Sequence, residues 1–364
     1  MEPAELAPWI KYDALFKAPS SNYWTHTDVA ALSLKVAAFA LTLTLFPYRR
    51  TLYAWAGYEL VRHVVGRLIM TCLFPLQSRI VKYFFAAFKT NALDLARAEV
   101  KKILEASEQG FQVKHIGLTK NGVTYSALAI SHENNCIDCW ALQATGNGEP
   151  IEYSACDFAE IYRTMKFNVL LVNGPGAGRS RGHATPATMG DAQAAGISYL
   201  EDHIKAKKIV IAGRSLGGAA ISLAILKHTF KEDVAYLVSR QMTFDTASHI
   251  AAEVVGGQEC STLFKKLVSA LFWWTNLEID SVAASKKLQD LNIKEIIVQK
   301  GTSRGTDMPT SECFRHDGVI TVRASLGYQL VSQRITKNKH FYCLDEHHMS
   351  NMVISAPLEH ITAL

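Results

Sequence analysis

A single serine stands among glycines in the stretch GRSLGG, which runs from Gly213 to Gly218. Glycines two residues before and two residues after Ser215 let the backbone turn sharply without a side-chain clash. An apolar run, residues 208–213, precedes the serine, and an apolar helical pattern follows it. A serine held at such a strand-to-helix turn is presented for nucleophilic attack on a carbonyl carbon. A serine that only caps the helix is the alternative interpretation.

A serine hydroxyl needs a base, and two adjacent histidines near the end of the chain can supply it. His347 and His348 follow the last apolar run, residues 339–344, almost directly. Only imidazole takes up and returns a proton near neutral pH. Helix phasing favours His348, because Met352 and Val353 would then face the core, and His347 is the alternative base.

The third member of a triad is an acid, and its expected position is a loop after a late strand. Asp317, in HDGVITV, fits best because it follows the predicted strand 294–301 and precedes a helical pattern. Asp307 is the alternative in the same long loop, and Asp245, after the preceding strand, ranks third. We therefore expect Asp317 to orient the imidazole of the base.

An early glycine-rich loop is the candidate partner of the serine turn in holding an oxyanion. The loop ATGNGEP, residues 144–150, follows the predicted strand 139–144. The backbone N–H groups of Asn147 and of Leu216, the residue after the serine, are the expected donors. The positive end of the helix that begins there would add to their effect. An ordinary Gly-Asn-Gly turn is the alternative for the early loop.

The elements that must position these residues alternate between strand and helix. An antiparallel pair comes first, joined by TKNG, in which Asn-Gly is a hairpin signal. Continuous apolar runs separated by helical patterns then predict a mostly parallel sheet with helices on both faces. A helical, aromatic stretch, residues 247–291, interrupts this rhythm and is expected to form an insertion over the carboxyl edge of the sheet. The predicted strands of the parallel part are 139–144, 167–173, 208–213, 234–239, 294–301 and 339–344.

Taken together, these motifs resemble the Bem46-like serine hydrolases of the α/β-hydrolase fold. TGNG resembles the HGNG oxyanion loop of that family, with Thr145 in place of the usual histidine, and GRSLGG resembles its serine turn. RHDGVI resembles its acid loop, although TSRGTDMPTSECFRH intervenes here between the strand and Asp317. The likeness extends from about residue 139 to the end of the chain and is close to a chlamydial-type family with an apolar N-terminal extension. It implies a serine hydrolase that needs no metal and no cofactor.

The first part of the chain, residues 1–108, differs from the predicted hydrolase domain, residues 109–364. Residues 29–46 are apolar apart from Lys35 and are at the short limit for a membrane-spanning helix, which needs about 20 residues. Residues 53–76 are interrupted by charges, which favours an amphipathic helix. We expect membrane association through residues 29–76, and the alternative is a pair of helices buried against the hydrolase domain. A spanning helix would leave that domain on the cytoplasmic side.

Composition restricts the classes of partner and compartment. The net charge is +5 and is spread over many segments, which is unlike a nucleic-acid-binding arm. Seven scattered cysteines argue against a disulfide scaffold and for a reducing compartment. Cys136 and Cys139 form one C-x-x-C pair, which alone is weak evidence for metal or redox chemistry. The expected location is the bacterial cytoplasm, or a membrane with the hydrolase domain in the cytoplasm, and a secreted effector is the alternative.

The sequence thus predicts a serine hydrolase that cleaves an ester, thioester or amide of a small or lipid-like acyl substrate. Ser215 attacks, His348 transfers the proton, Asp317 orients the imidazole, and the N–H groups of Asn147 and Leu216 hold the oxyanion. A non-catalytic, membrane-associated interaction or effector protein on the same fold is the second hypothesis. It is favoured by the atypical acid loop and by Thr145 in the oxyanion loop.

Overall fold

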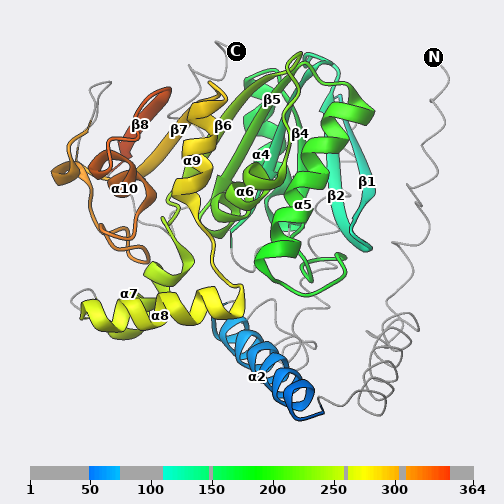
Figure 1. Ribbon diagram of the computed structural model, residues 1–364. Coiled ribbons are helices and arrows are strands. Elements are labelled where there is room, and N and C mark those ends of the chain that lie inside the picture. Colours follow the sequence, from blue (N-terminus) through cyan, green and yellow to red (C-terminus); the bar gives the residue numbers. More distant parts are fainter. Residues whose placement is uncertain (1–48, 74–109, 147–150, 258–260, 303–308, 345–364) are drawn as a thin grey trace.

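The computed structural model describes residues 49–73, 110–146, 151–257, 261–302 and 309–344 (Figure 1). At its centre is a sheet of eight strands in the order β1-β2-β4-β3-β5-β6-β7-β8. The pairs β1/β2 and β2/β4 are antiparallel, and all other neighbouring strands are parallel. The strands are β1 (Phe111–Lys120), β2 (Val123–His132), β3 (Cys139–Ala144), β4 (Asn168–Val172), β5 (Lys208–Arg214), β6 (Ala235–Gln241), β7 (Lys294–Lys300) and β8 (Lys339–Leu344).

Alternate residues of the central strands face two separate apolar clusters. Leu142 of β3 and Ile211 of β5 belong to one cluster, which includes side chains of α5, α6 and α9. Ala141 and Val210, one residue earlier on the same strands, belong to the other cluster, which includes side chains of α4. The helices around the sheet are α4 (Ile151–Thr164), α5 (Pro186–Ser198) with its π-helical continuation η3 (Tyr199–Ile204), α6 (Leu216–Lys227), α9 (Ser281–Asp290) and α10 (Leu326–Ser332).

The continuous apolar character of the strands follows from this arrangement. A strand that is covered on both faces has no side chain turned to water, so apolar residues occupy both faces. All six residues of β3 and all five of β4 are buried. The predicted fold class, a mostly parallel sheet with helices on both faces, is confirmed.

Residues 247–291 divide into two parts. Helices α7 (Ala247–Gly256) and α8 (Thr262–Thr275) pack together away from the sheet (Figure 1). Helix α9 instead packs beside α6 and contributes Ala284 and Leu288 to a cluster on the sheet. Between β7 and β8 lie the short 3-10 helix η4 (Ser311–Cys313) and α10. The predicted domain boundary at residues 108 and 109 lies outside the described residues.

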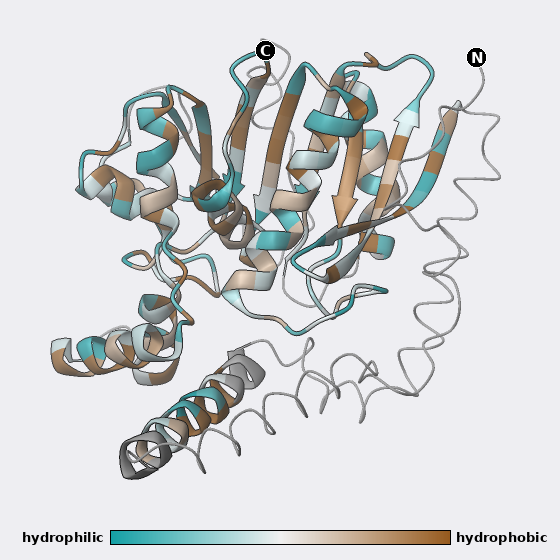
Figure 2. Ribbon diagram, turned by 45° about the vertical axis from the view of Figure 1, so that its right-hand side comes forward, coloured by the Kyte–Doolittle hydropathy of each residue, from teal (hydrophilic) through white to brown (hydrophobic). Residues whose placement is uncertain are grey.

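One long helix, α2 (Arg49–Leu73), reaches the rest of the protein through α8. Arg62 donates from Nε to the carbonyl of Trp274 over 2.5 Å, and the Trp274 indole donates to the Tyr58 hydroxyl over 2.6 Å. None of the helices that the structure describes combines the length and apolar character that crossing a membrane requires. The apolar run 29–46 lies outside the described residues. Figure 2 shows α2 and α8 below the sheet, with hydrophilic and hydrophobic residues mixed along both.

Candidate active site

Ser215 occupies the sharp turn between β5 and α6. Its backbone has φ 52° and ψ −122°, a region that non-glycine residues rarely adopt and that costs on the order of 1–3 kcal/mol. The surrounding structure supports this conformation, because the Ser215 N–H donates to the Gln241 carbonyl over 2.8 Å. The side chain is half-buried, and its hydroxyl makes no capping hydrogen bond to α6. The geometry is therefore unlike that of a serine whose hydroxyl caps the helix.

The glycines around Ser215 are required by close contacts. A Cβ on Gly213 would lie 2.7 Å from the backbone carbon of Gly217, and a Cβ on Gly217 would lie 2.6 Å from the carbonyl oxygen of Thr145. A Cβ on Gly218 would overlap the Thr243 hydroxyl. None of these three glycines has a positive φ. The turn thus depends on small residues because backbone segments approach each other closely there.

The close contact at Gly217 brings the first turn of α6 against the end of β3. Leu216 is the first residue of α6, so its N–H belongs to the helix end that carries the positive dipole. Thr145, which follows β3, is half-buried beside Gly217. The predicted oxyanion donors belong to these two segments. Asn147, the predicted second donor, lies outside the described residues.

Asp317 is completely buried in the loop between β7 and β8. Its Oδ1 accepts hydrogen bonds from the N–H groups of Val319, over 2.9 Å, and of Ile320, over 2.6 Å. These two bonds fix the orientation of the carboxylate. Ile320 belongs to the same apolar cluster as Leu216, so the Asp317 turn and the serine turn pack against one shared core.

Two of the three predicted triad positions, Ser215 and Asp317, lie in described segments that follow parallel strands of the sheet. Strands β5, β7 and β8 run parallel, and Ser215, Asp317 and the histidine pair each follow the carboxyl end of one of them. Chain segments that follow parallel strands emerge at the same edge. His347, His348 and the alternative acid Asp307 lie outside the described residues. The assignment of the base and the choice between the acids remain predictions.

Asp245, the third-ranked acid, belongs to a different group of polar side chains. Its Oδ2 lies 2.8 Å from Nδ1 of His249, and Nε2 of the same ring lies 3.1 Å from the Glu253 carboxylate. Lys265 of α8 pairs with Glu253 over 2.7 Å, and the Thr321 hydroxyl donates to the other Glu253 oxygen. We call these five residues the α7 polar cluster. It links α7, α8 and the segment just after Ile320.

Burial and charge act in opposite directions within the α7 polar cluster. Burial raises the pKa of Asp245 to about 6, against the lowering effect of the His249 hydrogen bond. Burial lowers the pKa of His249, but the hydrogen bond and charge of Asp245 and the charge of Glu253 outweigh it, so that pKa is raised. Burial likewise raises the pKa of Glu253, and Lys265 and Thr321 reverse the effect, so that pKa is lowered. The partner of Asp245 among the described residues is therefore His249.

Sequence reasoning missed the α7 polar cluster, although part of its signal is visible. Asp245, His249 and Glu253 recur every four residues, which places them on one face of a helix. A polar face on a helix usually points to water, so this spacing alone does not predict burial. Lys265 and Thr321 join the cluster only through tertiary packing, and the sequence carries no local signal for either.

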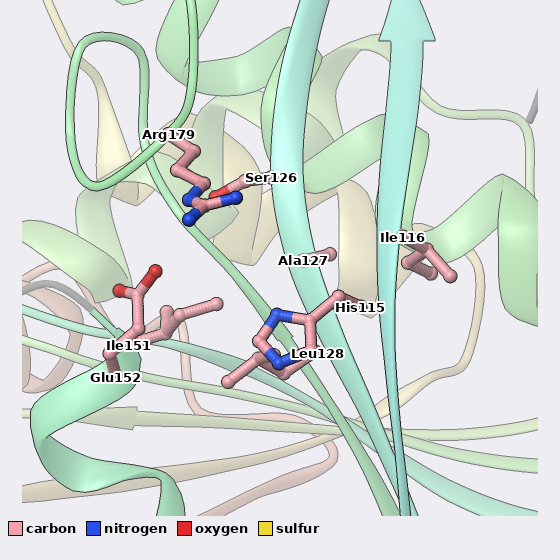
Figure 3. A pocket seen from close by; sticks show the side chains of 8 residues that line it. All are labelled: His115, Ile116, Ser126, Ala127, Leu128, Ile151, Glu152 and Arg179. Atoms are coloured by element: carbon pink, nitrogen blue, oxygen red, sulfur yellow. The ribbon is translucent and has the colours of Figure 1, made fainter. Parts of the chain in front are cut away.

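A small pocket lies beside the start of α4. Figure 3 shows Arg179, His115 and the Glu152 carboxylate around it, with β1 and β2 forming one wall. Glu152 is buried and accepts a hydrogen bond from Asn173 over 3.2 Å. The pocket has room for about one water molecule, so it is far too small for an acyl substrate.

Comparisons with known proteins agree on the fold. A family model described as "Chlamydia CHLPS protein (DUF818)" matches residues 60–363. Among solved structures, an alpha-beta hydrolase from Vibrio vulnificus is 14% identical, with a TM-score of 0.52, over 74% of this chain and 85% of that chain. This match shows that the chain has the α/β-hydrolase fold.

Two esterase structures are also similar. The Pyrococcus furiosus esterase Pf2001 is 18% identical over 70% of this chain and 90% of that chain, with a TM-score of 0.46. Est1E from Butyrivibrio proteoclasticus, solved with ferulic acid bound, is 14% identical over 68% of this chain and 96% of that chain, with a TM-score of 0.47. No curated protein matches the sequence.

Proposed function

This chain belongs to the Chlamydia CHLPS protein (DUF818) family, and we propose that it is a serine hydrolase that cleaves an ester, thioester or amide. The observation that carries the proposal is the strained backbone of Ser215 at the turn from β5 to α6. A conformation of this cost persists only where the surrounding structure enforces it, and such sites are concentrated where chemistry is done. The α/β-hydrolase fold places a nucleophile at this position.

The proposed reaction divides the work among residues at one edge of the sheet. The Ser215 hydroxyl attacks the substrate carbonyl while His348, or His347, takes its proton. Asp317 holds the imidazole in the productive tautomer. The N–H groups of Leu216 and Asn147 stabilise the oxyanion of the tetrahedral intermediate. The histidine then gives its proton to the leaving group, and a water molecule hydrolyses the acyl-serine by the same steps, without a metal or cofactor.

The surroundings of the serine turn support an acyl substrate with an apolar part. Leu216 shares an apolar cluster with Phe244 after β6, Ala251 of α7 and Phe272 of α8. Phe272 is buried, whereas its neighbour Trp273 is 77% exposed. The aromatic stretch of α8 therefore contributes to the core near the turn and also presents a ring to the outside. We propose a small-molecule or lipid-like acyl substrate on this basis.

A specific observation favours membrane association, which is one part of the second candidate function, a non-catalytic membrane-associated protein. Large apolar side chains are exposed on α2 and α8, among them Trp55, Leu60, Leu263, Leu267 and Trp273. Exposed apolar residues beside basic ones are typical of a surface that lies on a lipid bilayer. This property is compatible with catalysis, so the two functions differ only in whether Ser215 reacts.

Labelling with a fluorophosphonate probe tests the proposed function. The probe phosphonylates a serine only when a base activates it. The full-length protein should become labelled, and Ser215→Ala should not. Ser332→Ala is the matched control, because Ser332 is an exposed serine at the end of α10, and it should label like the wild type. A folded wild-type protein that takes no label would favour the non-catalytic function.

A further inference from the structure

Two cysteine side chains meet at the beginning of β3. The Sγ atoms of Cys136 and Cys139 lie 2.7 Å apart. The residues form a tight turn, in which the Cys139 N–H donates to the Cys136 carbonyl over 3.2 Å. A disulfide bond is about 2.05 Å long, so the sulfurs need only a small further approach to bond.

The turn that carries the two cysteines is fixed from several sides. The Cys136 N–H donates to the Lys166 carbonyl over 3.0 Å, and the Asn168 side chain donates to the Cys136 carbonyl over 2.9 Å. The carbonyl of Asp138, inside the turn, accepts from the N–H of Lys207 over 2.9 Å. Because the backbone is held in this way, bringing the two sulfurs together costs little conformational entropy.

The two thiols differ in access. Cys136 is exposed, whereas Cys139 is 7% exposed and belongs to an apolar cluster on the sheet. Burial, followed by the hydrogen bond to Cys136, raises the pKa of the Cys139 thiol to about 12. A dissolved oxidant therefore reacts with Cys136 first, and Cys139 is the thiol that reacts in the second step.

From this geometry we propose that Cys136 and Cys139 form a reversible redox site that closes to a disulfide. The oxidant is a low-molecular-weight disulfide such as glutathione disulfide. The Cys136 thiolate attacks one of its sulfurs, and the first glutathione leaves and takes a proton. Cys139 then loses its proton as its sulfur attacks the mixed disulfide and displaces the second glutathione. Two protein thiols are oxidised, and one small disulfide is reduced to two thiols.

The redox site is separate from the candidate active site. Cys139 pairs with Lys208, the first residue of β5, whereas Ser215 follows the last. Ser215 is seven residues after Lys208, so at about 3.3 Å per residue the two positions are about 23 Å apart. Among the described residues, no group of three or more His, Cys, Asp and Glu side chains could hold a metal ion. The proposal therefore depends neither on catalysis by Ser215 nor on a metal centre.

Thiol mapping of the full-length protein tests this proposal. The protein is equilibrated in buffers of rising glutathione disulfide content, alkylated, digested and analysed by mass spectrometry. We expect the peptide with both cysteines to lose two hydrogens and to escape alkylation, and dithiothreitol should reverse this. Cys139→Ser should instead retain one glutathione on Cys136.

The control variant is Cys313→Ser, because Cys313 is half-buried far along the chain and its sulfur contacts the Thr310 hydroxyl. It should leave disulfide formation at Cys136 unchanged. Circular dichroism verifies that each variant is folded before oxidation. The proposal is wrong if the folded wild type keeps both thiols alkylatable in the most oxidising buffer. It is equally wrong if a mixed disulfide on Cys136 persists while Cys139 remains a free thiol.

Discussion

Gly217 packs so closely against Thr145 that a Cβ on the glycine would lie 2.6 Å from the carbonyl oxygen of the threonine. This contact joins the first turn of α6 to the end of β3. It fixes the distance between the two backbone segments from which the oxyanion donors are proposed to come. The spacing of those donors is therefore set by the lack of a side chain at Gly217.

Gly217→Ala should impair both stability and catalysis. The added methyl group must displace the carbonyls of Ala144 and Thr145, which are backbone atoms in or next to a buried strand. Overpacking of this kind costs typically about 1–3 kcal/mol. Loss of one oxyanion donor costs about 10²–10³ in kcat. Thermal unfolding and hydrolysis of p-nitrophenyl esters measure the two effects.

The same change at Gly57 of α2 is the control, because a Cβ there meets no atom within 4 Å. Gly57→Ala should leave hydrolysis unchanged, and α2 should gain up to about 1 kcal/mol from the higher helix propensity of alanine. If Gly217→Ala behaved like this control, the close contact would have no role in positioning the oxyanion donors.

Asp317→Asn should reduce kcat by about 10⁴ while leaving the fold intact. An asparagine side chain still offers a carbonyl oxygen to the N–H groups of Val319 and Ile320, so the buried turn is retained. It lacks the charge that holds the imidazole in the productive tautomer. Ester hydrolysis at saturating substrate measures kcat, and the unfolding midpoint shows whether the turn is preserved.

Asp307→Asn is the companion variant, because Asp307 is the alternative acid in the same loop. It should retain nearly full activity if Asp317 is the triad acid. The reverse pattern, with Asp307→Asn inactive and Asp317→Asn active, would move the assignment to Asp307. If both variants were as active as the wild type, neither aspartate would be the acid of the proposed mechanism.

The sequence predicts the fold well because each strand carries its own signal. Buried parallel strands are continuous apolar runs, and β3 begins and ends where the run CWALQA does. The turn at Ser215 is also predictable, because the glycine spacing records the close contacts around it. Local patterns suffice in both cases because the apolar run and the glycine spacing are each visible within a few residues of sequence, although Gly217 itself contacts the distant Thr145.

Local sequence patterns do not predict which charged side chains become buried through tertiary contacts. Arg240 of β6 and Glu295 of β7 are completely buried and form an ion pair, and Lys339 of β8 lies 2.8 Å from the other Glu295 oxygen. In the sequence each of these residues is one charge at or near the end of an apolar run. Only the order of the strands in the sheet brings the three together, and that order is not a local property. For the base of the proposed triad the sequence alone leaves His347 and His348 as alternatives, because local patterns do not decide which of two adjacent side chains reaches Ser215.

The α7 polar cluster should make the stability of the protein fall as the pH rises. Asp245 has a pKa near 3.9 when unfolded and about 6 when folded, so folding favours its protonated form. Its contribution to stability is therefore largest at low pH and is lost as the pH rises from about 4 to 6. His249 acts in the same direction, because its raised pKa stabilises the folded state below about 6.5 and this contribution is lost as the pH rises through the folded value. The pKa of Glu253 is lowered, so its contribution to stability rises with pH, but only below about pH 4.5.

Unfolding midpoints measured between pH 5 and 8 test this expectation. Asp245→Asn removes one titrating group and the main cause that raises the pKa of His249. The loss of stability between pH 5 and pH 8 should therefore become smaller by about 1.4 kcal/mol from Asp245 alone, and the change at His249 acts in the same direction. Asp233→Asn is the control, because Asp233 is an exposed aspartate that pairs with Lys207 at the surface. It should leave the slope unchanged above pH 5. An Asp245→Asn slope equal to that of the wild type would contradict the role of the cluster.

The exposed apolar side chains of α8 should bind a lipid surface. Leu263, Leu267 and Trp273 are each at least 60% exposed, and Lys266 lies exposed on the same helix, which has no acidic residue in its first turn. Apolar and basic residues together favour insertion at the interface of an anionic bilayer. Full-length protein should therefore float with vesicles of phosphatidylcholine and phosphatidylserine. Replacing the three apolar residues by glutamine should reduce the bound fraction.

Ile137→Gln supplies the matched control for that replacement. Ile137 is 79% exposed, but it lies in the turn between Cys136 and Cys139, at the end of the sheet opposite to the serine turn. Removing it should leave flotation unchanged, because it is remote from α8. High salt should weaken binding if Lys266 contributes, since exposed charges are screened beyond about 10 Å at 0.1 M. If the triple variant floated as well as the wild type, α8 would not be the lipid-binding element, and the predicted membrane association would have to come from α2 or from the apolar run 29–46. Carbonate extraction of a variant that lacks residues 1–90 would then show whether this N-terminal part of the chain holds the protein on membranes.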